Sequence, residues 1–152
     1  MVVSHEVHLK ERPIGMPSNE NFEIVEVQIP ELRDDEFLVR NIWMSVDPYM
    51  RGRMIERKSY IPPFELGRAL DGGCVGRVVE SKNNQFAVGD YVLGMKGWCE
   101  YWISDGNPAT GIGKIDPNRV PIQFYLGIFS HGSTSWKKYF FVTLVQFPFT
   151  TT

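Results

Sequence analysis

The feature that most constrains the fold is a succession of short, β-prone segments that glycine and proline interrupt over residues 1–120. Segment 22–30, FEIVEVQIP, alternates apolar and polar residues as a half-buried strand does, and Phe37–Val46, FLVRNIWMSV, predicts a longer strand. Further short strands are predicted at 5–11, at 69–81, and in YVLGM, WCEYWIS and GKI. Helical periodicity is nearly absent before 120–128, where a helix is predicted to begin. The sequence therefore predicts a small, mainly β barrel or sandwich with few short helices.

The size and net charge of the chain limit which kinds of binding partner are expected. The chain has 152 residues, which fits one domain of ordinary size. Its net charge of -2, from 16 Lys and Arg against 18 Asp and Glu, gives no case for nucleic-acid binding. The sequence has no apolar run near the roughly 20 residues that cross a bilayer, and its charged start lacks the apolar stretch of a signal peptide. We therefore expect a cytoplasmic protein that binds neither nucleic acid nor membrane.

The stretch SVDPYMRGRM, at 45–54, is the first candidate for a functional segment. It follows the predicted strand Phe37–Val46, and Asp47-Pro48 is a turn signal, so a loop is expected after the strand. Strand ends that open into loops are where binding and catalytic residues tend to lie.

The glycine-rich DGGCVG carries Gly72, Gly73 and Gly76. A phosphate-binding G-x-G-x-x-G leads from a strand into a helix, whereas the RVVES that follows here predicts a strand. We expect a bulged or tightly curved strand instead. Cys74 and Cys99 belong to no CxxC or Cys/His cluster, so they are predicted to be buried thiols and no metal site is expected.

Four segments now form an ordered pattern: SVDPYMRGRM, LDGGCVGRVVES, FAVGDYVLG and GWCEYWIS. In this order they resemble the N-terminal, GroES-like domain of the medium-chain dehydrogenase/reductase superfamily. VDPYMR narrows the resemblance to the zinc-independent branch of NADPH-dependent alkenal double-bond reductases, which includes prostaglandin reductases and curcumin reductase. The resemblance covers about 1–128 and implies a GroES-like, partly open β-barrel.

The resemblance also implies which cofactor and substrate to expect. Zinc-dependent relatives carry a cysteine ligand after this strand and a histidine in a Gly-His-Glu segment, but the corresponding segments here read SVDPYM and ELGRALDGG, which implies no zinc. In this branch NADPH delivers hydride to the β-carbon of an α,β-unsaturated ketone or aldehyde, of the 2-alkenal or 15-oxoprostaglandin type. A conjugated, apolar carbonyl compound is therefore the expected substrate.

Site residues follow from the same resemblance. Tyr49 is implied as the catalytic residue, because its hydroxyl would lie beside the nicotinamide and donate a hydrogen bond to the developing enolate oxygen. Met50 is expected to give the substrate apolar contact, and Arg51 to orient the loop or attract anionic groups. Further substrate contacts are expected from three residues after FAVGDYVLG, namely Met95, Lys96 and Trp98.

Each of these roles has a structural alternative. Tyr49 could instead pack its ring under the loop, Arg51 and Arg53 could be solvated, and the residues after FAVGDYVLG could pack the end of the barrel. His5 and His8 are expected to be surface residues of a terminal strand.

The family pattern stops near Phe129. Relatives continue into a Gly-Met-Pro-Gly-Leu-Thr-like segment and a Rossmann domain, and neither is present in 129–152. We therefore divide the chain into a substrate-side domain at 1–128 and an atypical tail at 129–152. Because the main NADPH site would belong to the absent domain, we expect no tightly bound cofactor and little or no activity from this chain alone.

The tail has three candidate origins: a changed reading frame or splice, an expression vector, or a genuine strand that covers a bare barrel edge. A β-prone tail beside an open edge predicts homodimerisation or aggregation. The leading hypothesis is a fragment of an NADPH-dependent oxidoreductase that reduces the conjugated carbon–carbon double bond. The alternatives are a non-catalytic GroES-like interaction module and a fragment of a quinone or enoyl-thioester reductase.

Overall fold

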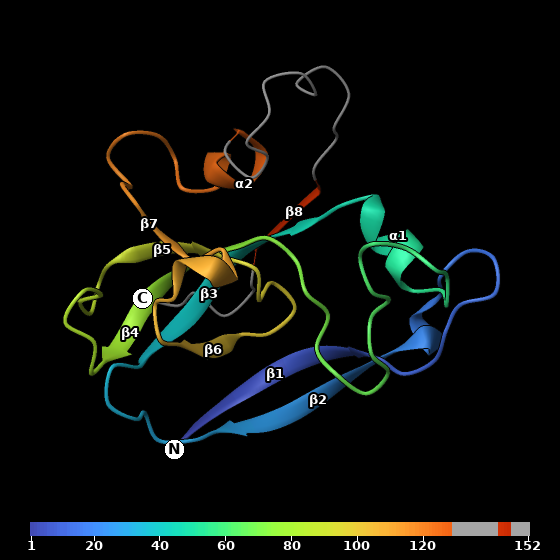
Figure 1. The fold of residues 1–152 in the computed structure, drawn as a ribbon, viewed down its shortest axis with the longest axis horizontal. Coiled ribbons are helices and arrows are strands. Elements are labelled where there is room, and N and C mark those ends of the chain that lie inside the picture. The colour runs from blue at the N-terminus through green and yellow to red at the C-terminus, as the bar shows by residue number, and fades with distance from the viewer. Residues whose placement is uncertain (129–142, 147–152) are drawn as a thin grey trace.

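A computed structural model describes residues 1–128 and 143–146 of the chain. Two antiparallel sheets and a few short helices make up this part (Figure 1). In chain order the elements are β1 (Val2–Leu9), η1 (Asn19–Asn21), β2 (Phe22–Ile29), β3 (Phe37–Val46), α1 (Tyr49–Arg53), β4 (Cys74–Ser81), β5 (Tyr91–Gly94), β6 (Tyr101–Ser104), η2 (Pro108–Thr110), β7 (Gly113–Ile115), α2 (Phe124–Ile128) and β8 (Thr143–Gln146).

The smaller sheet is the pair β1 and β2, which lies beneath the larger sheet in Figure 1. The two strands pair without a shift from Val2 opposite Ile29 to Leu9 opposite Phe22. Alternation is clear on β2, where Val27 and Ile29 are half-buried and Gln28 between them is exposed. Two backbone bonds tie β1 to the segment before β6: the Val7 amide donates to Trp98 O at 2.8 Å, and the Glu100 amide donates to His5 O at 3.0 Å.

The larger sheet has the order β6-β3-β4-β5-β7, with β8 pairing beside β3. One edge of β3 pairs with β4. The other edge pairs first with β6, from Phe37 to Arg40, and then with β8, from Trp43 to Val46. The end of β3 that leads into α1 is therefore fixed by its backbone on both sides.

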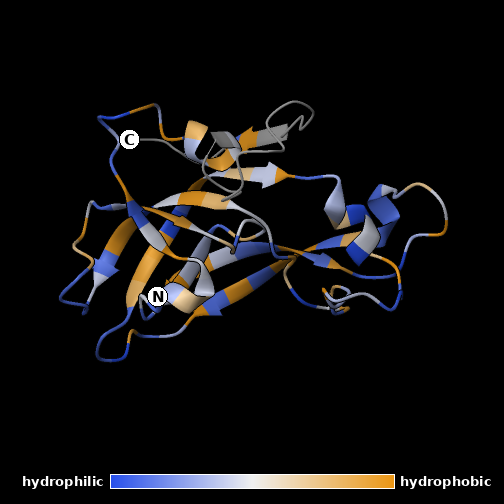
Figure 2. Cartoon of the chain, turned by 45° about the horizontal axis from the view of Figure 1, so that its top comes forward, coloured by the Kyte–Doolittle hydropathy of each residue, from blue (hydrophilic) through white to orange (hydrophobic). Residues whose placement is uncertain are grey.

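The core consists of apolar clusters between these elements. The largest holds Phe37, Val39, Cys74, Val78, Val92 and Trp102, among others, and Phe37 stacks on Phe86 with ring centroids 4.3 Å apart. A second cluster is Leu9, Met50, Met54, Phe64 and Leu70, and it joins β1 to α1. Figure 2 shows the corresponding bands of apolar and polar residues along the strands. Each fully buried large side chain contributes roughly 2 kcal/mol to folding, so these clusters dominate stability.

The predicted fold class is confirmed: the chain is mainly β with few short helices, and its sheets stay open rather than closing into a barrel. The strand Phe37–Val46 has the predicted bounds. The strand predicted at 69–81 begins only at Cys74, and its pairing with β3 shifts register at two places, as a bulged strand does. Gly76 is needed there because a Cβ would lie 2.6 Å from the Arg40 carbonyl oxygen.

The loop predicted after β3 is partly wrong, because Tyr49–Arg53 forms the helix α1. Pro48 has φ -57° and ψ -30°, which are already helical values, and the Met50 amide donates to Asp47 O at 3.0 Å. The Asp-Pro pair that signals a turn therefore also begins a helix.

The expected surface position of His8 is also wrong. His8 is only 8% exposed, and its Nε2 lies 2.8 Å from Glu6 Oε2. The reason is that β1 is covered by the segment before β4: His8 bridges to Ala69, and the Leu70 amide donates to Val7 O at 3.2 Å. His5, by contrast, keeps the expected exposed position.

The predictions for most of the tail fall on residues 129–142 and 147–152, which lie outside the described residues. Of the tail, β8 pairs antiparallel with the end of β3. In the described ranges, no helix has the length and apolar character needed to cross a membrane.

Candidate functional site

The candidate site forms where three segments meet: the end of β3 with α1, residues 71–73, and residues 95–99. The Ser45 amide donates to Gly73 O at 2.9 Å. The Gly72 amide donates to Met95 O at 3.1 Å, and the Gly97 amide donates back to Gly72 O at 2.9 Å. Gly72 and Gly73 therefore lie between the two segments that carry the predicted substrate residues.

Tyr49, Met50 and Trp98 come together in the second core cluster. Met50 is 2% exposed and belongs to the cluster, while the half-buried Tyr49 and Trp98 pack against it. The Tyr49 ring therefore packs as the structural alternative expected. Its hydroxyl makes no hydrogen bond within the described residues, so it is still available to a ligand. The contact of Met50 with a substrate stays a prediction, and its observed contacts are those of a core residue.

The pKa of the Tyr49 hydroxyl is raised above its ordinary value of 10.0. Burial is the main cause, and the negative charge of Asp47 adds to it, whereas Arg53 opposes it. The hydroxyl therefore stays protonated at neutral pH and can act as a hydrogen-bond donor.

A buried polar pair fixes the turn that carries Tyr49. The Ser45 hydroxyl donates to Asp47 Oδ2 at 2.9 Å, and both residues are buried. A Cβ on Gly73 would lie 2.9 Å from Ser45 Oγ, so a glycine leaves room for this pair. Asp47 also adds to the rise in the pKa of Tyr49, although burial remains the main cause.

Gly72 gives space to two of the predicted residues. A Cβ there would lie 2.6 Å from Met50 Cε and 3.2 Å from Trp98 Nε1. The indole Nε1 is buried and has no hydrogen-bond partner in the described ranges. Such an unpaired donor costs free energy unless a partner reaches it.

The two arginines of α1 behave differently. Arg51 donates through Nη2 to Gly15 O, whereas its Nη1 is buried without a partner among the described residues. Arg53, which was not among the predicted substrate residues, donates through Nε to Pro62 O at 3.0 Å and lies 4.0 Å from the centre of the Phe64 ring. Its side chain is only 15% exposed, so the solvated alternative is wrong for Arg53.

Met95 and Lys96 lie apart from the Tyr49 cluster, at a cavity of about 390 Å³ that Arg53 and Asp71 also line. Asp71 links the two parts, because its carboxylate is 3.4 Å from Arg53 Nη2 and 3.8 Å from Lys96 Nζ. Met95 is 43% exposed, and the Lys96 side chain 60%. Sequence reasoning missed Arg53 and Asp71, although both lie within the quoted motifs.

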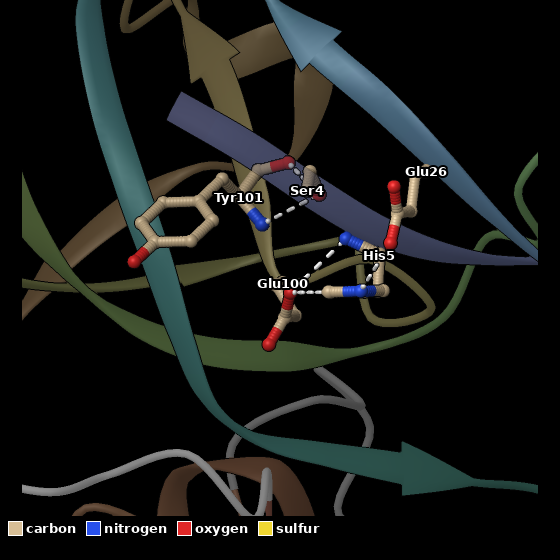
Figure 3. A network of polar contacts seen from close by, with 5 residues as sticks. All are labelled: Ser4, His5, Glu26, Glu100 and Tyr101. Atoms are coloured by element: carbon tan, nitrogen blue, oxygen red, sulfur yellow. Dashed lines mark hydrogen bonds and ion pairs between the residues drawn. The ribbon is translucent and has the colours of Figure 1, made fainter. Parts of the chain in front are cut away.

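A polar network ties Glu100 and Tyr101, directly after the 95–99 segment, to the small sheet (Figure 3). Glu100 Oε2 accepts from the His5 amide at 3.0 Å and lies 2.5 Å from His5 Nδ1. Glu26 Oε1 is 3.4 Å from His5 Nε2. The hydrogen bond with Glu100 is the main cause of a raised His5 pKa, and the two carboxylates add to it.

Both cysteines are buried free thiols, as predicted. Burial raises the pKa of Cys74 to about 12 and raises that of Cys99 as well, so neither is poised as a nucleophile. Among the described residues, no group of three or more His, Cys, Asp or Glu is placed to hold a metal. The absence of zinc in the whole protein remains a prediction.

The described residues do not fit the pyrophosphate of a dinucleotide. Gly73 leads directly into β4, as the sequence predicted, and not into a helix whose amides could bind phosphate. Both described α-helices have only five residues.

Comparison with known proteins identifies the family. Residues 5–112 match the family described as the N-terminal domain of oxidoreductase, so the chain belongs to this family. It is 43% identical to NADPH-dependent curcumin reductase of Escherichia coli over 72% of the chain and 32% of that protein. It is 37% identical to the NADP(+)-dependent 2-alkenal reductase of Nicotiana tabacum over 84% of the chain and 38% of that protein.

A solved structure shows the same fold. CurA from Vibrio vulnificus in complex with NADPH is 35% identical and superposes with a TM-score of 0.76 over 84% of this chain and 37% of that one. The predicted resemblance to the curcumin and alkenal reductase branch is thus confirmed. The chain spans about a third of the length of the curated relatives it matches.

Proposed function

We propose that this chain forms the substrate side of an NADPH-dependent oxidoreductase that reduces the carbon–carbon double bond of α,β-unsaturated ketones or aldehydes. The observation that carries the proposal is the Tyr49 hydroxyl, which is protonated and unbonded within the described residues, on a half-buried side chain that packs against the same apolar cluster as Trp98. Support for the cofactor comes from the likeness to NADPH-dependent curcumin reductase and to CurA with NADPH.

In this proposal the chain supplies a fixed hydrogen-bond donor. When bound in the whole enzyme, NADPH supplies the hydride that reduces the β-carbon. Negative charge then develops on the carbonyl oxygen, and the Tyr49 hydroxyl donates to it. A donor held in place before the reaction stabilises this charge without reorganisation, and the apolar cluster around it lowers the local dielectric.

The remaining predicted residues define the substrate class. Trp98 and Met95 offer aromatic and thioether surface to a flat, conjugated compound such as a 2-alkenal or a 15-oxoprostaglandin. Lys96 contributes a cation at the cavity beside Asp71, and Arg51 contributes a second cation from the last turn of α1. Met50 supports Tyr49 from within the core.

The chain alone should not reduce enones, because the described residues lack a pyrophosphate site and hydride transfer needs both reactants held close together.

A homodimer through the open sheet edge and a cytoplasmic location also remain proposals. Light scattering after size exclusion tests the first, and a clean monomer would count against it. Fractionation of cells tests the second.

Binding of an enone tests the proposal directly. We expect benzylideneacetone to bind the full chain weakly, with a Kd of roughly 1 mM by calorimetry. Tyr49→Phe should weaken binding about fivefold, because one hydrogen bond is worth about 1 kcal/mol. Tyr60→Phe, at a position 95% exposed, is the matched control and should bind as the unmodified chain does.

Two results would contradict the proposal. Equal affinity of the Tyr49→Phe and Tyr60→Phe variants would remove Tyr49 from the site. Sustained NADPH oxidation with benzylideneacetone by the 152-residue chain, with no partner added, would show that the chain is not the inactive part of an enzyme.

A further inference from the structure

Asn41 is a buried polar residue of β3 that neither the motifs nor the family resemblance single out. It is 1% exposed and lies where the pairing of β3 with β4 shifts register, between Asn41 and Trp43. A buried amide is costly unless its hydrogen-bonding groups have partners. The partners of Asn41 therefore indicate why an amide is tolerated there.

Its partners lie in the segment that carries Lys96 and Trp98. Asn41 Nδ2 donates to Lys96 O at 2.6 Å and to Cys99 O at 2.7 Å. Trp102 Nε1 donates to Asn41 Oδ1 at 2.8 Å. Because an indole N–H only donates and these two carbonyls only accept, the amide fits in one orientation alone.

The same segment is held at its other carbonyls by backbone groups. Met95 O accepts from the Gly72 amide at 3.1 Å, and Trp98 O accepts from the Val7 amide at 2.8 Å. Asn41 thus supplies a side-chain bond at each end of the turn from Lys96 to Cys99, and Cys99 Sγ adds a weaker one to Lys96 O at 3.2 Å.

We propose that Asn41 is a positioning residue: its amide fixes the turn 96–99 and thereby the place of Lys96 and Trp98 relative to Tyr49. The catalytic meaning of this role rests on the proposed function, whereas the hold on the turn does not. Asn41 touches neither substrate nor Tyr49 in this scheme and acts only through the turn.

Asn41→Asp is the decisive variant. Aspartate keeps the oxygen that accepts from Trp102 but replaces the donor by an oxygen facing two carbonyls. Ser4→Ala is the matched control: Ser4 is 0% exposed, and its hydroxyl bonds the amide and the carbonyl of Tyr101, beyond the turn (Figure 3).

The first readout is hydrogen exchange of the full chain. In Asn41→Asp we expect exchange at 96–100 to rise at least about tenfold relative to β2, whereas Ser4→Ala should change the two segments alike. Equal changes in both segments of folded Asn41→Asp would overturn the proposal.

If Asn41→Asp does not fold, hydrogen exchange of the unmodified chain tests whether the turn is held. The Gly97 amide, which donates to Gly72 O at 2.9 Å inside the held turn, should then exchange only with the denaturant dependence of global unfolding. Exchange of Gly97 that is independent of denaturant would overturn the proposal.

The second readout is benzylideneacetone binding. Asn41→Asp should weaken it about tenfold, and Ser4→Ala should leave it unchanged. Unchanged binding by Asn41→Asp would overturn the role in positioning. Absence of binding by the unmodified chain would instead count against the proposed function, and the exchange comparison would still decide the hold on the turn.

Discussion

The two segments that carry the predicted substrate residues are held in different ways. The helix α1 is anchored by side-chain burial: Met50 and Met54 lie in the core, and Arg53 packs on Phe64. In the 95–99 segment Trp98 and Cys99 reach the core, but Met95 and Lys96 bury little side-chain surface, and hydrogen bonds from Gly72, Val7 and Asn41 hold the backbone. Apolar anchoring tolerates substitutions of similar volume, whereas hydrogen-bonded anchoring depends on individual atoms.

The largest effect should follow from emptying the apolar anchor. Met50→Ala should lower the free energy of unfolding by about 3 kcal/mol, since it leaves a cavity under Tyr49. Met50→Leu, which keeps the volume, should cost less than about 1.5 kcal/mol. Chemical denaturation measures both, with the 43% exposed Met95→Ala as a control that should stay near the unmodified value. Equal losses from Met50→Ala and Met95→Ala would break the contrast.

A smaller but clear loss is expected from crowding the backbone anchor. A Cβ on Gly97 would lie 2.9 Å from Gly72 O and 3.0 Å from Gly73 O, so Gly97→Ala must move backbone and should cost about 2 kcal/mol. Gly113→Ala on β7 meets nothing within 4 Å and is the matched control. Thermal unfolding compares the two, and a Gly97→Ala variant as stable as Gly113→Ala would show that the segment is not tightly held.

The titration of Tyr49 sharpens the comparison at the apolar anchor. Its pKa is raised in the folded chain, so the protonated form is favoured by folding. The stabilising contribution is present below the unfolded value of about 10 and is lost as pH rises through the higher folded pKa. Ultraviolet difference spectra of the unmodified chain and Tyr49→Phe should place the missing ionisation above pH 10. Ionisation below that value would contradict the buried setting.

The smallest effect concerns the exposed contact at the end of the backbone-anchored segment. The pKa of His5 is raised, mainly by its hydrogen bond with Glu100, so its contribution to stability is present below the unfolded value of about 6.5 and is lost as pH rises through the folded pKa. The melting temperatures of the unmodified chain and His5→Gln should therefore differ more at about pH 5 than at about pH 8. A larger difference in melting temperature at the higher pH would contradict a stabilising contact between protonated His5 and Glu100.

The sequence predicted that α1 and the 95–99 segment carry substrate residues, but it did not predict which residues hold the 95–99 segment in place. The strand Phe37–Val46 and the VDPYMR motif were predictable because each is a local pattern. Asn41 reads only as a polar interruption of that strand, since its partners lie 55 and 58 residues further along the chain. Burial of His8 was missed for the same reason, because the cover comes from the distant Ala69. Arg53 and Asp71 needed the folded chain to become neighbours.

The most direct test of the central claim is an amide and indole chemical-shift map of the full chain titrated with benzylideneacetone. If α1 and the 95–99 segment form one substrate site, shifts should gather at 49–51 and 95–98 and include the Trp98 indole. Shifts gathered instead at the cavity of about 530 Å³ between β1, β2 and Leu38, or shifts at one segment alone, would show that the two segments do not form one site.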